Sequence, residues 1–133
     1  MKECKLINLP NFNDQHGKMT VLEADMALPF SPKRAFFIYD VPKNQTRGNH
    51  ANIKTKFVMV AINGSVDIIV SNGFNQKTFT LNDPTKGLFL DSNTWKTMKN
   101  FSKNAVLLII ADTKYDKTEY ITDYAEFKER QVE

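Results

Sequence analysis

Two apolar segments, Phe57 to Ile62 and Val66 to Val70, flank the dipeptide Asn63-Gly64. Asn-Gly is the strongest short sequence signal for a β-hairpin, because both residues tolerate the positive φ angles of a tight turn. Further turn signals follow at Ser71-Asn72-Gly73, at Asp83-Pro84 and at Asp91-Ser92-Asn93. Short strands separated by turns at intervals of about ten residues are typical of an antiparallel sandwich or barrel. The pattern therefore predicts an all-β fold.

The other predicted elements complete a single domain that covers residues 1–133. Further strands are predicted at Val21-Leu22, Pro32 to Tyr39, Gln76 to Leu81, Gly87 to Leu90 and Ala105 to Ala111. The last of these is continuously apolar, which suits a central strand buried on both faces. Residues 122–131 predict a C-terminal helix, with Thr122 as its N-cap and with Tyr124 and Phe127 on one face. The expected fold is an antiparallel β-barrel with a short C-terminal helix.

Charge and cysteine content limit the classes of partner and compartment. The net charge of +3 is spread along the chain, without the basic run that binding to nucleic acid or an anionic membrane would lead us to expect. Cys4 is the single cysteine, which excludes an internal disulfide and suits a reducing compartment. No apolar run is long enough to span a bilayer, and the N-terminus lacks the charged and then apolar segments of a signal peptide. We therefore expect a soluble, cytoplasmic protein.

The segment Thr46 to Asn52 holds the residues with the clearest chemical potential. His50 and Asn52 are two positions apart, so on a strand they face the same side. An imidazole titrates near neutral pH without special tuning, which makes His50 a candidate general base. The alternative is a structural histidine that is hydrogen-bonded inside a small barrel. Arg47 can pair with a phosphate in bidentate geometry, or it can form an ordinary ion pair at the surface.

The amino-acid sequence around this segment resembles that of the small cupins that act as nucleotide-sugar 3,4-ketoisomerases. The resemblance is carried by Pro32 to Asp40, by Arg47-Gly48-Asn49-His50-Ala51, by Asn63 to Val66, by Leu81 to Pro84, by Gly87 to Leu90, by Trp95 with Met98, and by Asp116 to Ile121. It runs from about Ile7 to Phe127. It implies an RmlC-like jelly-roll barrel that needs no cofactor. The implied reaction converts a dTDP-4-keto-6-deoxyhexose into its 3-keto isomer, in deoxyamino-sugar biosynthesis for surface polysaccharide such as O-antigen.

The resemblance also implies roles for individual residues. His50 takes the position of one of two catalytic histidines, and Arg47 lies at the barrel mouth. The expected substrate-binding residues are Arg34, Arg47, Asn52, Tyr39, Trp95 and His16. Among these, Arg34 helps to hold the nucleotide sugar, and Trp95, in a turn-rich stretch beside the cleft, stacks on a thymine or sugar face.

Several positions depart from the family pattern. Asn52 stands at the second histidine position, and an amide cannot take up and return a proton at neutral pH. Phe36 and Phe37 stand where tyrosines are common, and Tyr39 faces the same side as Phe37 as a possible replacement. Lys96 stands where a histidine is usual, and His16 stands where an arginine often precedes glycine. These changes leave open an alternative function, that of a non-catalytic or weakened cupin that binds a nucleotide sugar or supports a partner enzyme.

The usual metal ligands of cupins are missing from the sequence. The second histidine is replaced by Asn52, the glutamate position falls on Phe57, and no histidine lies near Met98. One imidazole and one amide make a poor site for zinc, iron or nickel, so we expect no metal. The resemblance implies a homodimer in which the N-terminal segment is exchanged between subunits, and Lys5 to Leu9, which ends at Pro10, suits an edge strand added to the partner's sheet at the interface.

Overall fold

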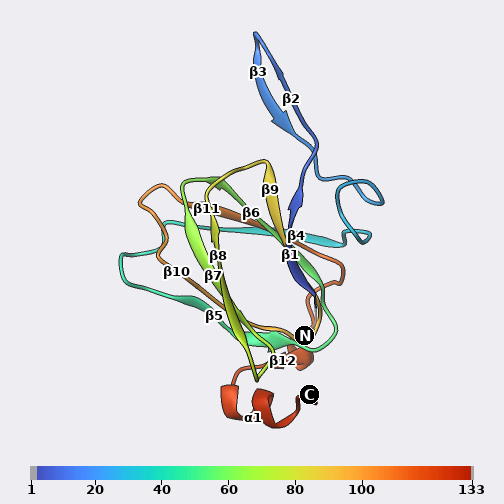
Figure 1. The fold of residues 1–133 in the computed structure, drawn as a ribbon, viewed down its shortest axis with the longest axis vertical. Coiled ribbons are helices and arrows are strands. Elements are labelled where there is room, and N and C mark those ends of the chain that lie inside the picture. Colours follow the sequence, from blue (N-terminus) through green and yellow to red (C-terminus); the bar gives the residue numbers. More distant parts are fainter. Residues whose placement is uncertain (1–2, 133) are drawn as a thin grey trace.

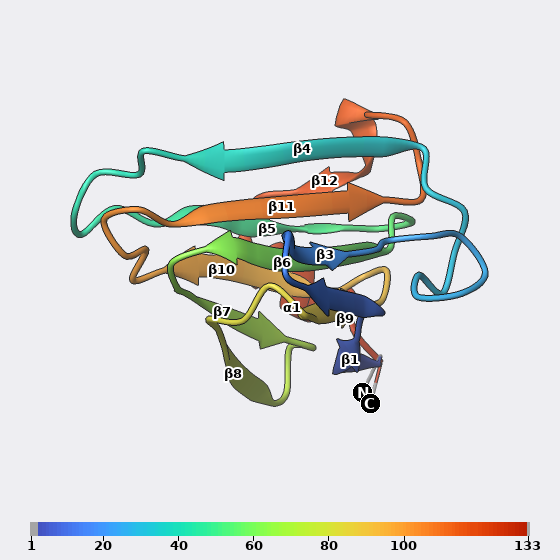
Figure 2. The ribbon, with the colours of Figure 1, turned by 90° about the horizontal axis from the view of Figure 1, so that it is seen from above.

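The computed structural model describes residues 3–132, which form two five-stranded antiparallel sheets and a separate hairpin. The first sheet has the order β1 (Cys4–Asn8), β9 (Lys86–Leu90), β6 (Phe57–Asn63), β11 (Val106–Ala111) and β4 (Arg34–Tyr39). The second has the order β12 (Tyr120–Ile121), β5 (Arg47–Asn52), β10 (Trp95–Lys99), β7 (Val66–Ser71) and β8 (Gln76–Leu81). Figures 1 and 2 show this barrel from two directions. The predicted all-β cupin jelly roll is confirmed.

The main core lies between the two sheets and follows the two-residue period of the strands. Phe57, Met59 and Ala61 of β6 belong to this core, whereas Val58 and Val60 face the other side of the sheet. That outer face is covered by the irregular segment 21–30, from which Leu28 is almost fully buried. The strand predicted at Val21-Leu22 is therefore wrong, because these residues belong to a covering loop.

The Asn63-Gly64 turn does not close a β-hairpin, which corrects the sequence-based prediction. The two strands that it connects, β6 and β7, belong to different sheets, so the turn carries the chain from one sheet to the other. Asn63 Nδ2 donates to the carbonyl of Asn104 at 2.7 Å, and Ser65 N donates to Ser102 Oγ at 2.9 Å. Gly64 has a φ of 68°, and a Cβ at this position would lie 2.8 Å from Ala105 Cα. The loop before β11 thus sets the geometry of this corner.

A hairpin that the sequence did not predict projects from the barrel. Its strands are β2 (Asn11–Asp14) and β3 (Gly17–Thr20), and Figure 1 shows it extending away from both sheets. Residues 11–14 are all exposed, and β2 and β3 pair only with each other.

The C-terminal helix is present but shorter than predicted. The chain passes through a 3₁₀ turn, η1 (Lys117–Glu119), and strand β12 before α1 (Tyr124–Glu129) begins. The N-cap is Asp123 rather than Thr122, because its carboxylate accepts a hydrogen bond from Ala125 N at 3.0 Å. Phe127 is fully buried in a cluster with Ala51, Trp95 and Ile121, so the helix covers the second sheet at the β5–β10 end.

Lys5 to Asn8 lie in β1, at the edge of the first sheet of the same chain, and Leu9 follows this strand. Within the chain, β1 pairs antiparallel with β9, with Lys5 opposite Phe89. The homodimer, and the exchange of this segment within it, stay predictions.

Candidate active site

A cavity of about 190 Å³ opens between the sheets and is the centre of the candidate site. Five strands supply most of its walls, and the lining residues are Phe36, Ile38, Arg47, Gly48, His50, Phe57, Met59, Lys96, Met98, Ile109 and Tyr120. Most of these side chains are apolar, and the polar groups are concentrated on β5, β10 and β12. Sites that enclose a drug-sized ligand measure about 300–1,000 Å³. This cavity can therefore hold one part of such a ligand, with the rest outside.

His50 is held in one tautomer by its own strand. Its Nδ1 lies 3.0 Å from the carbonyl oxygen of Gly48, and a carbonyl can only accept, so Nδ1 carries the proton. This leaves Nε2 with a free lone pair. Burial and the positive charge of Lys96 lower the pKa of His50 to about 4, so the imidazole is neutral at physiological pH. The ring of Tyr120 lies 4.8 Å from the imidazole ring.

A bulge in β5 brings Arg47 and His50 to the same cavity. Strand β10 pairs Lys96 with His50 and Thr97 with Gly48, so Asn49 is the extra residue on β5. Without it, residues three apart would face opposite sides of the sheet. Gly48 has a φ of 83°, and a Cβ there would lie 2.9 Å from the carbonyl oxygen of Lys96. A glycine at this position therefore allows the bulge to form against β10.

Lys96 lies directly across from His50 and is almost completely buried. Its Nζ donates to Asn52 Oδ1 at 2.7 Å and lies 4.4 Å from the centre of the Phe57 ring. Burial, together with the nearby charge of Arg34, lowers the pKa of Lys96 to about 7, although the carboxylate of Glu119 opposes this shift. Asn52 is also buried, and its Nδ2 has no hydrogen-bond partner among residues 3–132. Asn52 thus orients Lys96 from behind the cavity wall.

Glu119 fixes the loop that carries Tyr120. Its carboxylate accepts hydrogen bonds from Lys54 N at 2.9 Å, from Thr55 N at 3.0 Å and from the Thr55 hydroxyl. Burial alone would raise the pKa of Glu119, but these hydrogen bonds outweigh it, so the pKa lies below its ordinary value. The side chain is buried and ionised, and it connects η1 to the segment between β5 and β6.

Two arginines stand near the cavity. Arg47 lines both the main cavity and a neighbouring cleft of about 260 Å³, which is formed with Tyr39, residues 40–42, Gln45 and Thr46. The guanidinium of Arg34 lies 5.5 Å from the centre of the Phe36 ring and 5.7 Å from that of Tyr115. Its Nε and one of its Nη atoms are buried without a hydrogen-bond partner in the described part of the chain. Arg34 is not among the residues that line the main cavity.

Five of the six predicted binding residues do not line the main cavity: Arg34 and Asn52, which lie behind or beside its lining, and Trp95, Tyr39 and His16. Trp95 faces the outside of its sheet, where its ring lies 5.1 Å from Tyr124 and 5.7 Å from Phe127, so the expected stacking on a ligand is not supported. The reason is the alternation of β10, in which Lys96 and Met98 face inward. Tyr39 does face the same side as Phe37, but that side is exposed and bears only on the neighbouring cleft. His16 is exposed at the tip of the projecting hairpin.

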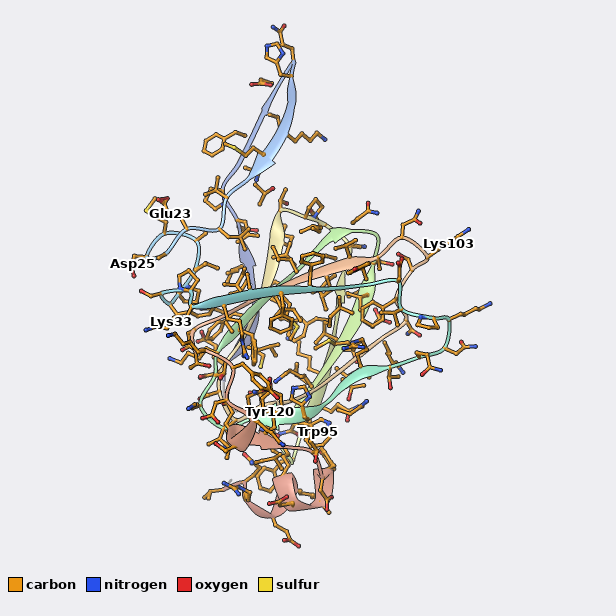
Figure 3. All side chains as sticks on the ribbon, turned by 180° about the vertical axis from the view of Figure 1, so that it is seen from behind. Glu23, Asp25, Lys33, Trp95, Lys103 and Tyr120 are labelled. Atoms are coloured by element: carbon orange, nitrogen blue, oxygen red, sulfur yellow. The ribbon has the colours of Figure 1, made fainter. Side chains whose placement is uncertain are left out.

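Two polar residues of the cavity, Tyr120 and Lys96, were not predicted as site residues. Tyr120 supplies a phenol beside His50, the group that Phe36 and Phe37 do not supply, and Figure 3 shows it near the C-terminal helix. Lys96 was treated only as a departure from the family pattern. Its position one residue after Trp95 placed it on the opposite face of the strand, which was the available signal for its orientation.

Among residues 3–132, no three His, Cys, Asp or Glu side chains gather in a group that could hold a metal ion. No helix within the same residues is both long and apolar enough to cross a membrane.

A jelly-roll barrel that contains a cavity lined by His50, Lys96 and Arg47 defines a cupin-type site. The sequence profile of the WxcM-like, C-terminal family (FdtA) matches residues 2–132. The TDP-4-oxo-6-deoxy-alpha-D-glucose-3,4-oxoisomerase of Aneurinibacillus thermoaerophilus is 36% identical over 126 residues, which cover 95% of this chain and 91% of that protein.

Solved structures agree with this match. The TDP-quinovose 3,4-ketoisomerase WlaRB of Campylobacter jejuni is 39% identical with a TM-score of 0.93, and the match covers 98% of this chain and all of that one. A histidine-to-asparagine mutant of the 3,4-ketoisomerase QdtA of Thermoanaerobacterium thermosaccharolyticum, solved with TDP-4-keto-6-deoxyglucose, is 34% identical with a TM-score of 0.93 over 96% of this chain and 93% of that one. The chain belongs to the FdtA/WxcM-like family of sugar 3,4-ketoisomerases.

Proposed function

We propose that this protein is a 3,4-ketoisomerase that converts a dTDP-4-keto-6-deoxyhexose into its 3-keto isomer, as a step of deoxyamino-sugar biosynthesis. The observation that carries the proposal is the neutral imidazole of His50, which lines the cavity and whose Nδ1 is bound to the Gly48 carbonyl, so that Nε2 carries the lone pair. Relatives at 34–39% identity that match nearly the whole chain are named for this reaction class.

The cavity contains what the reaction needs. Moving a ketone between neighbouring carbons requires that a proton leaves C3 and that another arrives at C4, through an enediolate. His50 Nε2 is the base that removes the C3 proton. The cationic side chain of Lys96 and the phenol of Tyr120 line the same cavity, where they favour negative charge on the C4 oxygen. No resident cofactor is part of this proposal.

The cavity is large enough for only one part of the substrate. The keto-sugar ring enters the cavity of about 190 Å³, and the nucleoside diphosphate remains outside. Arg47 stands between this cavity and the neighbouring cleft, so it is the first candidate for the diphosphate. Arg34, which has unpaired buried donors, is the second candidate.

The test is to incubate the protein with dTDP-4-keto-6-deoxyglucose and to follow the sugar signals by NMR. The proposal expects a new 3-keto hexose that does not form in buffer alone. The second candidate function, binding without turnover, is favoured by Asn52, because the second imidazole of the family is absent. It predicts that dTDP binds in calorimetry while the keto-sugar remains unchanged.

We expect Arg47→Ala to weaken dTDP binding by about 1.5–3 kcal/mol, the range for hydrogen bonds to charged groups. Isothermal calorimetry measures the change. The matched control is Arg130→Ala, which removes an exposed arginine at the end of α1 whose only ion pair in the described chain is with Glu126 at 3.9 Å. Equal affinity of the Arg47→Ala and Arg130→Ala proteins for dTDP would assign Arg47 to the surface and not to the ligand.

A further inference from the structure

Lys96 and His50 form a pair of titratable groups with different proton affinities on one cavity wall. They occupy opposite positions on β10 and β5, and both line the cavity. His50 is bound through Nδ1 to Gly48, and Lys96 is bound through Nζ to Asn52 Oδ1 at 2.7 Å. Each side chain is thus held by a partner that neither gives nor takes a proton at neutral pH. Environments that separate the pKa values of two neighbouring groups are a sign of paired acid and base roles.

We propose, on the basis of the proposed function, that Lys96 is a second catalytic residue of this reaction. In this assignment its ε-amine carries a proton between the two sugar oxygens, while His50 carries a proton between the two carbons. Lys96 replaces the proton-transfer group that is lost with asparagine at position 52.

The steps balance. His50 Nε2 takes the proton from C3, the C3–H electron pair forms the C3=C4 bond, and the C4 carbonyl oxygen takes a proton from the Lys96 ammonium. The product of this step is a neutral enediol, with an imidazolium and a neutral amine in the cavity. The amine then takes the proton from the C3 hydroxyl, the C3 carbonyl forms, and C4 takes the proton from the imidazolium. Both side chains return to their starting states.

The charged groups around Lys96 agree with this role. Burial is the largest influence on the pKa of Lys96 and lowers it, Glu119 on η1 raises it and Arg34 on β4 lowers it, with a resulting pKa of about 7. Cys4 on β1 also lies nearby, but burial raises its pKa, so it faces Lys96 as a neutral thiol. The positive charge of Lys96 in turn lowers the pKa of His50 on β5. Lys96 can therefore both give and accept a proton near neutral pH, which an ordinary exposed lysine does poorly.

The assignment predicts a specific pH dependence for the wild-type protein. The ammonium form is lost as the pH rises through about 7. Since kcat/KM reports the free enzyme, kcat/KM for isomerisation should fall above this pH, and it should fall on the acid side only as His50 is protonated near pH 4.

Two variants of Lys96 distinguish its role in proton transfer from the effect of its positive charge. Lys96→Arg keeps a positive charge that does not titrate, so exchange of the C3 hydrogen with deuterated water should stay within about tenfold of wild type, while isomerisation falls by about 10²-fold. The fall of kcat/KM above pH 7 should disappear in this variant. Lys96→Met removes the charge as well and should lower both exchange and isomerisation. Lys99→Arg, on the same strand but outside the cavity lining, is the control and should behave as wild type.

Each outcome decides one proposal. If Lys96→Arg isomerises at the wild-type rate with an unchanged pH profile, the role of Lys96 is overturned while the proposed function stands. Parallel loss of exchange, isomerisation and melting temperature in Lys96→Arg would make Lys96 structural. If neither variant folds, as judged by thermal unfolding and dTDP binding, the wild-type profile decides, and a kcat/KM that does not fall above pH 7 overturns the role. A wild-type protein that neither isomerises nor exchanges overturns the proposed function itself.

Discussion

His50→Gln is expected to lower the rate of isomerisation by on the order of 10²–10⁴-fold, the usual contribution of a general base. The amide of glutamine can replace a hydrogen bond, but it cannot accept the C3 proton at neutral pH. Exchange of the C3 hydrogen should fall in parallel. The measurement is the NMR time course of dTDP-4-keto-6-deoxyglucose with equal concentrations of the two proteins.

The same variant also distinguishes a catalytic histidine from a structural one. If His50 is the base, dTDP affinity and the free energy of unfolding change little, because Nδ1 makes a single hydrogen bond, to Gly48, among the contacts of residues 3–132. A structural histidine would show the reverse pattern. Stability would fall by about 1–3 kcal/mol as buried groups lose their partner, without a specific loss of chemistry. His50→Asn is the second variant, because its shorter amide shows whether an effect of His50→Gln is caused by a misplaced glutamine side chain.

Glu119→Ala is expected to destabilise the protein by about 3–5 kcal/mol. Its carboxylate satisfies two backbone N–H groups, of Lys54 and Thr55, and the Thr55 hydroxyl. Removing it leaves the two backbone N–H groups without this partner, whereas the Thr55 hydroxyl keeps the Thr113 hydroxyl at 2.6 Å. Each unpaired donor costs about 1–3 kcal/mol, so the combined loss is large. Denaturant unfolding at pH 7 measures the change. The control is Glu126→Ala on the exposed face of α1, whose salt bridge to Arg130 is worth less than about 1 kcal/mol.

The pH dependence of the unfolding free energy is a second test of the stabilising contacts of the Glu119 carboxylate. The folded-state pKa of Glu119 is lowered, so its stabilisation is fully present above the unfolded pKa of about 4.3 and is lost as the pH falls through the folded value. The unfolding free energy of the wild type should therefore fall more steeply below about pH 4.3 than that of Glu119→Ala. Parallel curves in acid would show that Glu119 makes no stabilising contacts as a carboxylate.

The strands of the barrel could be predicted from local patterns, but the connection between sheets could not. Asn63-Gly64 indicates a sharp reversal, and the reversal is present. Whether such a turn joins two strands of one hairpin or connects two sheets depends on its hydrogen-bond partners. Here these partners are Ser102 and Asn104, about 40 residues further along the chain. The projecting hairpin was missed for a related reason, since β2 and β3 are short and exposed and carry no apolar pattern.

For the candidate site, too, the sequence alone could not predict which side chains face the cavity. The sequence pointed to His50 and Arg47, but their spacing of three places both at one cavity only because Asn49 forms a bulge, and this depends on the pairing with β10. Trp95 and Lys96 illustrate the reverse case. Composition favoured the aromatic residue as the ligand contact, whereas the alternation of the strand turned the lysine inward and covered the tryptophan with α1. The environment that lowers the pKa of Lys96 brings together β1, β4 and η1, and no local pattern contains it.

Deuterium transfer during turnover tests the central claim most directly. The wild-type protein is incubated with dTDP-4-keto-6-deoxyglucose in deuterated water, and C3 and C4 of the sugar are followed by ¹H NMR. Isomerisation through an enediol with His50 as the base predicts that the C3 hydrogen signal disappears and that a 3-keto product accumulates, whose C4 carries the hydrogen transferred from C3 or, where the imidazolium has exchanged its proton with the solvent, deuterium. A sugar that keeps its C3 hydrogen throughout, although dTDP binds to the protein, would contradict the account.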